Sequence, residues 1–155
     1  MQAYVKPAGN RMQVLVRVPL KTIRDVDFPE RAGGYLDVEK LTPLLRDLAK
    51  VWIADAVEIQ EGETRLPKPQ VAATQISLAS DRSFTSFEEA LAHMAGPRLA
   101  NRDNVVWNQV LFDVLAGGLT PREGKVLLAA IRIDPPTSPR ALTTLCWALT
   151  SAAAA

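Results

Sequence analysis

Hydrophobic and polar residues alternate along the first part of the chain in the pattern of a β-hairpin. Between residues 12 and 18 every second side chain is apolar (Met12, Val14, Val16 and Val18), and two of the three residues between them are polar (Gln13 and Arg17). Residues 7–10, Pro-Ala-Gly-Asn, have the composition of a turn. Period-two alternation beside turn residues predicts two antiparallel strands, the first of which begins at Gln2.

A helical period appears in the next part of the chain. Residues 21–30 mix charged and apolar side chains and predict a connecting segment, and residues 32–35 predict a turn. Thr42 and Pro43 are typical of a helix N-cap and first helical position, and apolar residues recur after them at helical spacing (Leu44, Leu45, Leu48, Val51 and Trp52). We therefore expect a helix over residues 42–55. Alternation over 55–60, a turn at 61–63 and a return at 65–66 predict a second hairpin.

Three further elements follow. Residues 71–78 predict a strand with apolar residues on one face and Gln75 and Ser77 on the other. Ser86 and Glu89 form a capping-box pattern, which predicts a helix over 86–95. Residues 105–115 are apolar at both alternating sets of positions and predict a central strand (Val106, Val110, Phe112 and Val114 on one face, Val105, Trp107, Leu111 and Leu115 on the other).

These elements predict an α+β, β-rich fold class, in which an antiparallel, sandwich-like sheet carries two short helices. We expect residues 1–115 to form this domain. Residues 116–155 differ in character: Gly117-Gly118 is expected to break the preceding strand, and residues 125–133 fit a strand or a helix equally well. This atypical segment is expected to be either part of the same domain or a truncated or disordered tail.

Composition narrows the function classes. With 155 residues the chain can bury one core without a structural metal or disulfide. The 18 basic and 17 acidic residues give a net charge of +1, so no strong field attracts nucleic acid or an anionic membrane. No apolar run reaches about 18 residues, and we expect no membrane span in this chain. The single cysteine, Cys146, leaves the redox compartment open because it cannot form an internal disulfide.

The candidate site residues are Asp81, Arg82 and His93. The segment Ser80-Asp-Arg-Ser83 is a polar cluster between apolar elements, and its composition favours a turn over a binding or catalytic loop. His93 is the only histidine, and no nucleophile elbow or His-x-Glu metal pattern accompanies it. A structural role near a helix C-terminus is therefore favoured for His93, and no catalytic residue is predicted.

A second candidate is the acidic group Asp25, Asp27 and Glu30. Its oxygens have the chemistry of a cation site, but Arg24 and Arg31 flank them and the spacing is not that of a calcium loop. We expect a solvated loop, with no metal site and no cofactor.

Seven motifs in order along the chain resemble one protein family. They are the segments 4–7 (Tyr-Val-Lys-Pro), 14–20, 24–29, 34–37, 52–55, 78–84 and 90–93 (Ala-Leu-Ala-His). Over about residues 2–115 they look like the N-terminal extracytoplasmic region of bacterial HupE/UreJ-type membrane proteins. These are hydrogenase and urease accessory proteins, similar to nickel or cobalt permeases. No metal ligand of the family's membrane part maps onto this sequence.

The resemblance implies a non-catalytic extracytoplasmic module, on the periplasmic side of a membrane-anchored parent, that contacts the parent's membrane domain or another partner. The alternatives are a small enzyme using Asp81, Arg82 and His93, or a soluble metal-delivery domain using carboxylates such as Asp25 and Asp27. The sequence as written has no leader, which predicts a cytoplasmic location if it is expressed alone, and it suggests a piece cut at both ends. Nucleic acid is not an expected partner, and the oligomeric state is left open.

Overall fold

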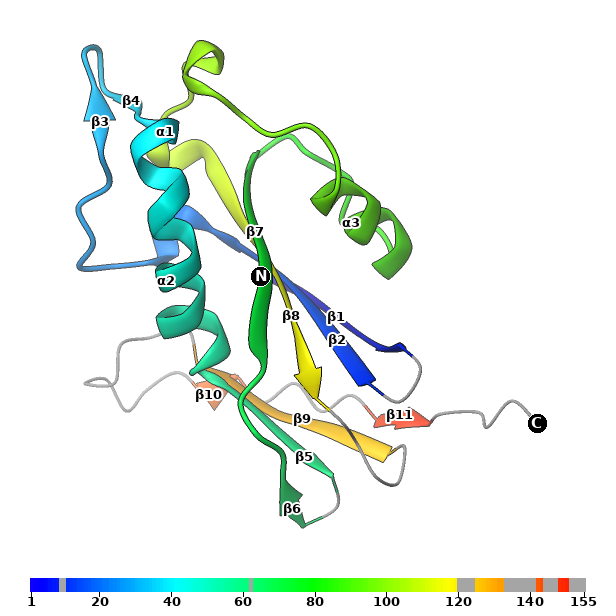
Figure 1. The fold of residues 1–155 in the computed structure, drawn as a ribbon. Coiled ribbons are helices and arrows are strands. Elements are labelled where there is room, and N and C mark those ends of the chain that lie inside the picture. The colour runs from blue at the N-terminus through cyan, green and yellow to red at the C-terminus, as the bar shows by residue number, and fades with distance from the viewer. Residues whose placement is uncertain (9–10, 62, 120–124, 133–141, 144–147, 151–155) are drawn as a thin grey trace.

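A four-stranded antiparallel sheet organises the fold (Figure 1). The structure is a computed structural model that describes residues 1–8, 11–61, 63–119, 125–132, 142–143 and 148–150. The strand order is β1-β2-β8-β7. The strands are β1 (Gln2–Ala8), β2 (Arg11–Pro19), β8 (Val110–Leu119) and β7 (Gln70–Leu78).

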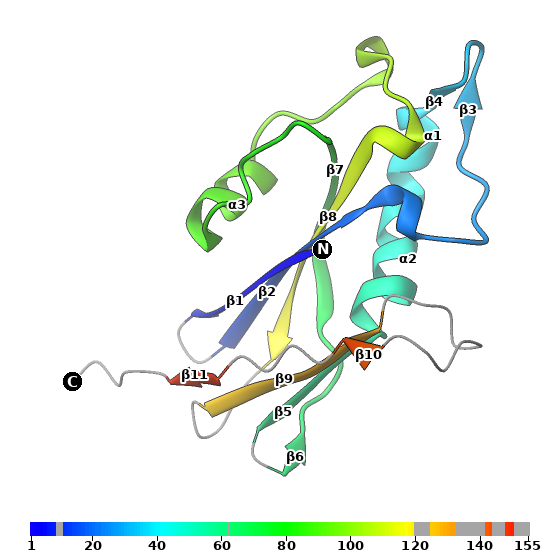
Figure 2. The same cartoon turned by 180° about the vertical axis from the view of Figure 1, so that it is seen from behind.

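A second sheet lies at one end of the first (Figures 1 and 2). Its path runs β10-β9-β5-β6, and β11 also pairs with β9. The strands are β5 (Val57–Glu61), β6 (Thr64–Arg65), β9 (Lys125–Arg132), β10 (Leu142–Thr143) and β11 (Ala148–Thr150). A small hairpin of β3 (Glu30–Arg31) and β4 (Tyr35–Leu36) stands apart from both sheets.

Helical segments cover the two faces of the four-stranded sheet. α1 (Val38–Leu41) and α2 (Leu45–Ala49) belong to one helical run that continues to Ala54, with a 3-10 turn between them and a π-helical turn at its end. α3 (Phe87–Met94) lies on the opposite face. Short 3-10 turns complete the described helical structure (Leu20–Thr22, Asn101–Asp103 and Trp107–Gln109).

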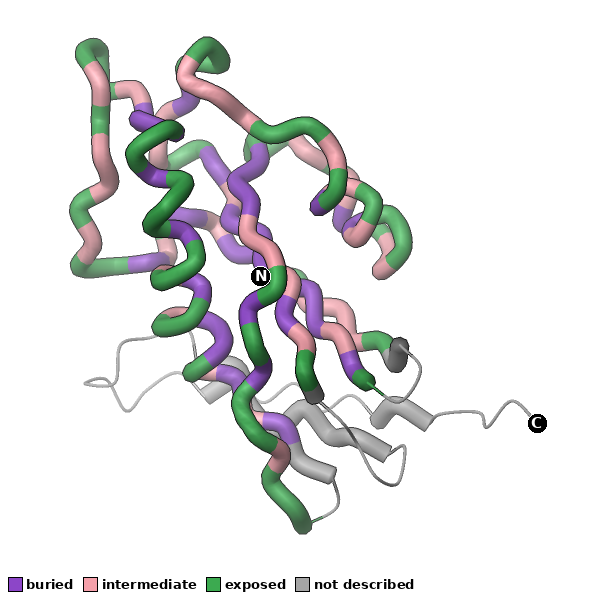
Figure 3. The backbone as a smooth tube through the Cα atoms, viewed as in Figure 1, coloured by how far each residue is buried: buried purple, intermediate pink, exposed green. Residues whose placement is uncertain are grey.

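The core divides between these two faces. On one face, side chains of β2 and β8 such as Val16 and Phe112 pack against Leu45 and Ile53 of the long helical run. On the other face a smaller cluster joins Leu15 of the sheet to Phe84 and to α3 (Ala90 and Met94). Figure 3 shows the buried residues concentrated along the central strands and the inner side of the helices.

The predicted fold class is confirmed: the protein is α+β, with an antiparallel sheet and two helical segments. The opening hairpin is also present, with β1 paired along its whole length to β2. The strand predicted at 71–78 corresponds to β7 and the helix predicted at 86–95 to α3, which has Ser86 as its N-cap.

The first predicted helix begins earlier than expected. It starts at Val38 because Asp37 accepts a hydrogen bond from the Lys40 amide, and because Val38 and Leu41 extend the buried apolar stripe toward the N-terminus. Pro43 is accommodated by the 3-10 turn. The hydroxyl of Thr42 donates to the carbonyl of Val38 inside the helix rather than capping it.

The predicted strand at 105–115 is wrong at both ends. Its first part forms an irregular segment in which the Val105 carbonyl accepts from the Leu36 amide and the Trp107 ring stacks on Phe28 at 5.9 Å between centroids. The strand then starts at Val110 and runs on through Gly117-Gly118 to Leu119 instead of breaking there. Gly118 has a φ of +80°, a conformation that glycine adopts without strain.

Beyond Leu119, the ambiguous segment near residue 125 forms strand β9, which pairs antiparallel with β5. The proline-rich segment at 135–139, Cys146 and Trp147 lie outside the described residues.

The cap of α3 gives a test of the local structure. The Ser86 hydroxyl accepts a hydrogen bond from the Glu89 amide at 3.2 Å. Ser86→Ala is expected to lower the free energy of unfolding by about 1 kcal/mol, because one amide of the first turn loses its partner. Urea denaturation measures the change. Ser80→Ala, at an exposed turn, is the matched control, and an equal loss in both variants would contradict the capping role.

A buried polar cluster and an exposed apolar groove

A row of polar side chains crosses the four-stranded sheet on the face that α3 covers. The strand register places Gln2 of β1 opposite Arg17 of β2, Arg17 opposite Asp113 of β8, and Asp113 opposite Gln75 of β7. Directly opposed residues in neighbouring strands share a face of the sheet. Four polar side chains, one from each strand, therefore lie in a row across the sheet. Three of them (Arg17, Gln75 and Asp113) are buried.

Arg17 and Asp113 form the centre of this row. Arg17 Nε donates to Asp113 Oδ1 at 2.7 Å, and Nη2 donates to Oδ2 at 2.9 Å. This bidentate geometry is the strongest pairing that a guanidinium and a carboxylate can make. Arg17 is 3% exposed and Asp113 is fully buried. Their charges are therefore compensated by each other's hydrogen bonds instead of by water.

The loop before α3 closes over Arg17. Asp81 Oδ1 lies 2.9 Å from Arg17 Nη2, and the Phe84 ring lies 4.1 Å from the guanidinium carbon in a cation–π contact. Burial by itself lowers the pKa of Arg17, but the hydrogen bonds and charges of Asp113 and Asp81 outweigh it and hold that pKa above its usual value.

Asp81 is held in its ionised form. Burial alone raises the pKa of Asp81, but hydrogen bonds from the Ser83 amide and hydroxyl, together with the contact to Arg17 and the charge of His93, outweigh it. The pKa of Asp81 therefore lies below its usual value.

His93 joins α3 to this cluster. Its Nδ1 lies 3.6 Å from Asp81 Oδ2, and its Nε2 lies 3.5 Å from Asp113 Oδ2 and 2.8 Å from the hydroxyl of Ser77. Ser77 Oγ in turn lies 2.5 Å from Asp113 Oδ2. A carboxylate accepts only, so the Ser77 proton is donated to Asp113, and the Ser77 oxygen accepts from His93 Nε2.

Gln75 completes the contacts of the ring. Its Nε2 lies 2.9 Å from His93 Nε2, and its Oε1 is buried without a hydrogen-bond partner. Gln75 Nε2 also donates to the backbone carbonyl of His93 at 3.4 Å. Gln75, Ser77, Asp81 and Asp113 therefore surround His93 within the fold.

The cluster contains the residue types of a Ser-His-Asp triad, in Ser77, His93 and Asp81, but its serine is buried and does not donate to the histidine. Ser77 is 3% exposed, and its hydroxyl donates to Asp113 instead of the histidine. A nucleophilic serine requires a hydrogen bond to its base and access to substrate. None of the three cavities described below is lined by these residues.

The structure brings two of the three predicted site residues together. Asp81 and His93 meet in the buried cluster, whereas Arg82 is exposed and makes no side-chain hydrogen bond or ion pair within the described residues. Asp25, Asp27 and Glu30 line an open cleft of about 590 Å³ together with Lys21 and Arg24. In the part of the chain that the structure describes, no three His, Cys, Asp or Glu residues are arranged to hold a metal ion.

Sequence reasoning missed Arg17, Ser77 and Asp113. Arg17 was expected only as a polar position of an alternating strand. The available signal was that Asp113 is the one charge in an otherwise apolar strand and that Arg17 stands among the apolar residues 14–18. Opposite charges isolated in this way in two central strands predict a cross-strand pair, provided that the strand order is known.

The other prominent feature is an apolar groove on the opposite side of the sheet from α3. One wall is the loop of residues 26–29, and the other is the long helical run, which contributes Leu41, Leu44, Leu48, Val51 and Trp52. Its volume is about 290 Å³. Val51 is 62% exposed and Leu44 is 47% exposed, whereas Leu41, at 1%, belongs to the core beneath.

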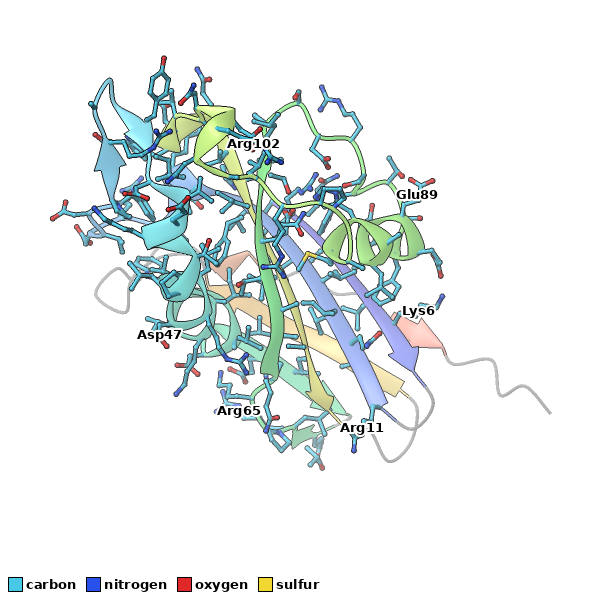
Figure 4. The ribbon with its side chains drawn as sticks, turned by 45° about the horizontal axis from the view of Figure 1, so that its top comes forward. Lys6, Arg11, Asp47, Arg65, Glu89 and Arg102 are labelled. Carbon is cyan, nitrogen blue, oxygen red and sulfur yellow. The ribbon has the colours of Figure 1, made fainter. Side chains whose placement is uncertain are left out.

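The charged residues that line this groove are both acidic. Asp27 comes from the loop wall and Asp47 from α2. Figure 4 shows Asp47 on the side of the molecule away from α3. Both aspartates are exposed, and within the described residues neither makes a side-chain ion pair or hydrogen bond. Lys50 and Arg46 of the same helical run line a different cleft, of about 540 Å³, which also includes Asp47. The groove thus combines an apolar lining with an acidic rim.

Comparison with family models, curated proteins and solved structures finds no match to this chain. Within the described residues, no helix has the length and apolar character needed to cross a membrane.

The buried ion pair gives a double-mutant test. Arg17→Met and Asp113→Leu are each expected to lower the free energy of unfolding by about 3–5 kcal/mol, because each leaves the other buried charge without its bidentate partner. The double variant is expected to lose much less than the sum, since neither member of the bidentate pair is left buried without the other. Urea denaturation of the four proteins measures the coupling. The control is the pair of Arg65 and Glu58, whose side chains are 63% and 28% exposed; this pair is expected to contribute less than about 1 kcal/mol.

Additive losses for Arg17→Met and Asp113→Leu would show that the two side chains do not stabilise each other. Should a single variant fail to fold, recovery of folded protein in the double variant reports the same coupling.

The depressed pKa of Asp81 predicts acid sensitivity. A carboxyl whose pKa is lower in the folded than in the unfolded state stabilises the fold above the unfolded value of about 3.9, and this contribution is lost as the pH falls through the folded pKa. Asp81→Asn is expected to be less stable than the parent chain at neutral pH and to lose less stability on acidification below about pH 4. Urea denaturation at a series of pH values measures both, with Asp25→Asn as the control. Parallel pH curves for Asp81→Asn and the parent chain would contradict the assignment.

Proposed function

We propose that this chain is a non-catalytic interaction module, an extracytoplasmic part of a HupE/UreJ-type membrane protein, and that it docks through its apolar groove. The observation that carries the proposal is the exposure of Leu44 and Val51 on a groove whose lining is mostly apolar. Contiguous exposed apolar surface on an ordered helix marks interaction sites, because covering it removes apolar area from water.

Order in the groove supports docking onto a preformed surface. The helical wall is anchored beneath by Leu41 and Leu45, which are buried in the core. The opposite wall is tied down by the stacking of Phe28 on Trp107. Because both walls are already fixed in the free protein, little conformational entropy is lost when a partner binds.

The enzyme and metal-delivery alternatives receive less support. Asp81 and His93 do meet, as the enzyme hypothesis requires, but their polar contacts are made within the fold and Arg82 lies outside them. Asp25 and Asp27 share their cleft with Lys21 and Arg24, whose charges oppose cation binding. The buried cluster is better explained as the link that holds α3 and its preceding loop on the sheet.

The test uses the membrane protein encoded at the chain's genomic locus. The proposal predicts a leader upstream and membrane helices downstream in that locus. With Cys146 replaced by alanine, Val51→Cys is expected to react with a membrane-impermeant maleimide in the isolated chain but to be protected in the intact membrane protein. Glu39→Cys, exposed on α1 outside the groove, is the control and is expected to react in both.

Equal labelling of Val51→Cys and Glu39→Cys in the intact protein would overturn the proposal, as would a locus without membrane helices. Because Val51 is exposed, its substitution is expected to change the free energy of unfolding by less than about 0.5 kcal/mol. Labelling of Val51→Cys by the maleimide in the isolated chain is therefore not a result of unfolding.

A further inference from the structure

We infer that the partner of the groove is an amphipathic helix that places aliphatic side chains between the two walls and lysine or arginine residues at the rim. This inference rests on the proposed function and specifies the chemistry of its partner. Three features of the groove support it: its shape, the charge of its rim and the positions of nearby basic residues.

The shape favours a helical partner. Leu41, Leu44, Leu48 and Val51 follow one another at spacings of three and four residues, so they form a stripe along the axis of the helical run. The stripe spans eleven residues from first to last, or ten helical rises of 1.5 Å, roughly 15 Å. The apolar face of a partner helix presents side chains at the same spacing and packs alongside such a stripe.

The charge of the rim specifies the polar part of the partner. Asp27 and Asp47 come from opposite walls, so a helix lying in the groove passes between two carboxylates. Basic side chains that flank its apolar face would pair with them at the edge of the interface, where long cationic side chains keep their charge in contact with water.

The same charges disfavour the two other occupants of an apolar surface. An anionic lipid surface would be repelled by Asp27 and Asp47 as Val51 approached it. A symmetric dimer through the groove would bring the acidic rims of two copies to one interface, because a two-fold interface uses the same patch on both subunits. Lys50 and Arg46, which would offset that repulsion, line the neighbouring cleft instead.

The experiment uses two fluorescein-labelled amphipathic helical peptides with the same leucine face, one flanked by lysines and the other by glutamates. Binding to the full chain is measured by fluorescence anisotropy. The lysine peptide is expected to bind roughly fivefold or more tightly than the glutamate peptide. Asp27→Lys combined with Asp47→Lys is expected to reverse that preference, and Leu44→Ser with Val51→Ser to weaken binding of both peptides by about tenfold or more.

The control carries Glu39→Lys and Glu63→Lys, which change the net charge equally at exposed positions outside the groove and are expected to keep the original preference. Failure of both peptides to bind, or a preference that survives reversal of Asp27 and Asp47, would overturn the inference. So would binding to anionic phosphatidylglycerol vesicles in place of the peptide, or a dimer in sedimentation velocity that Val51→Ser abolishes. Protection of Val51→Cys in the intact membrane protein is independent of these results, so the proposed function can stand where this partner chemistry fails.

Discussion

The buried pair of Arg17 and Asp113 is the constraint on which one half of the structure depends. Two charges at the centre of a sheet are stable only if each is neutralised and its hydrogen-bonding groups are used. Their bidentate contact requires that β2 and β8 pair in one register, because a slip of one residue would place one of the charges on the apolar face. The pair therefore selects the strand register as well as contributing to stability.

The same pair organises what lies above the sheet. Asp81 and Phe84 close over Arg17 from the loop, and His93 reaches Asp113 from α3. On the opposite face the contacts are almost wholly apolar, and there the long helical run turns Leu44 and Val51 outward. Polar groups are thus gathered inside the protein on one side of the sheet, while apolar groups are exposed on the other.

Local patterns predicted much of the fold. The alternation around Val14 and Val16 yields β2, and the pairing of Ser86 with Glu89 yields the start of α3, because each signal depends on residues that are neighbours in the chain. The errors fall where distant contacts decide. Asp37 extends the first helix with the help of Asn101, whose amide donates to the Asp37 carboxylate. The segment at Val105 is apolar like a strand, yet its carbonyl is taken by Leu36.

By itself the sequence determined the fold class and the positions of most elements, since period, caps and turn residues act over a few residues. It also placed Asp81 and His93 among the residues to consider. Only the tertiary structure decided that they meet, because Arg17, Ser77 and Asp113 come from three strands whose order and register are not local properties. The groove depends in the same way on the loop at Phe28 coming to lie beside the helix at Val51, a contact between segments that share no pattern in the sequence.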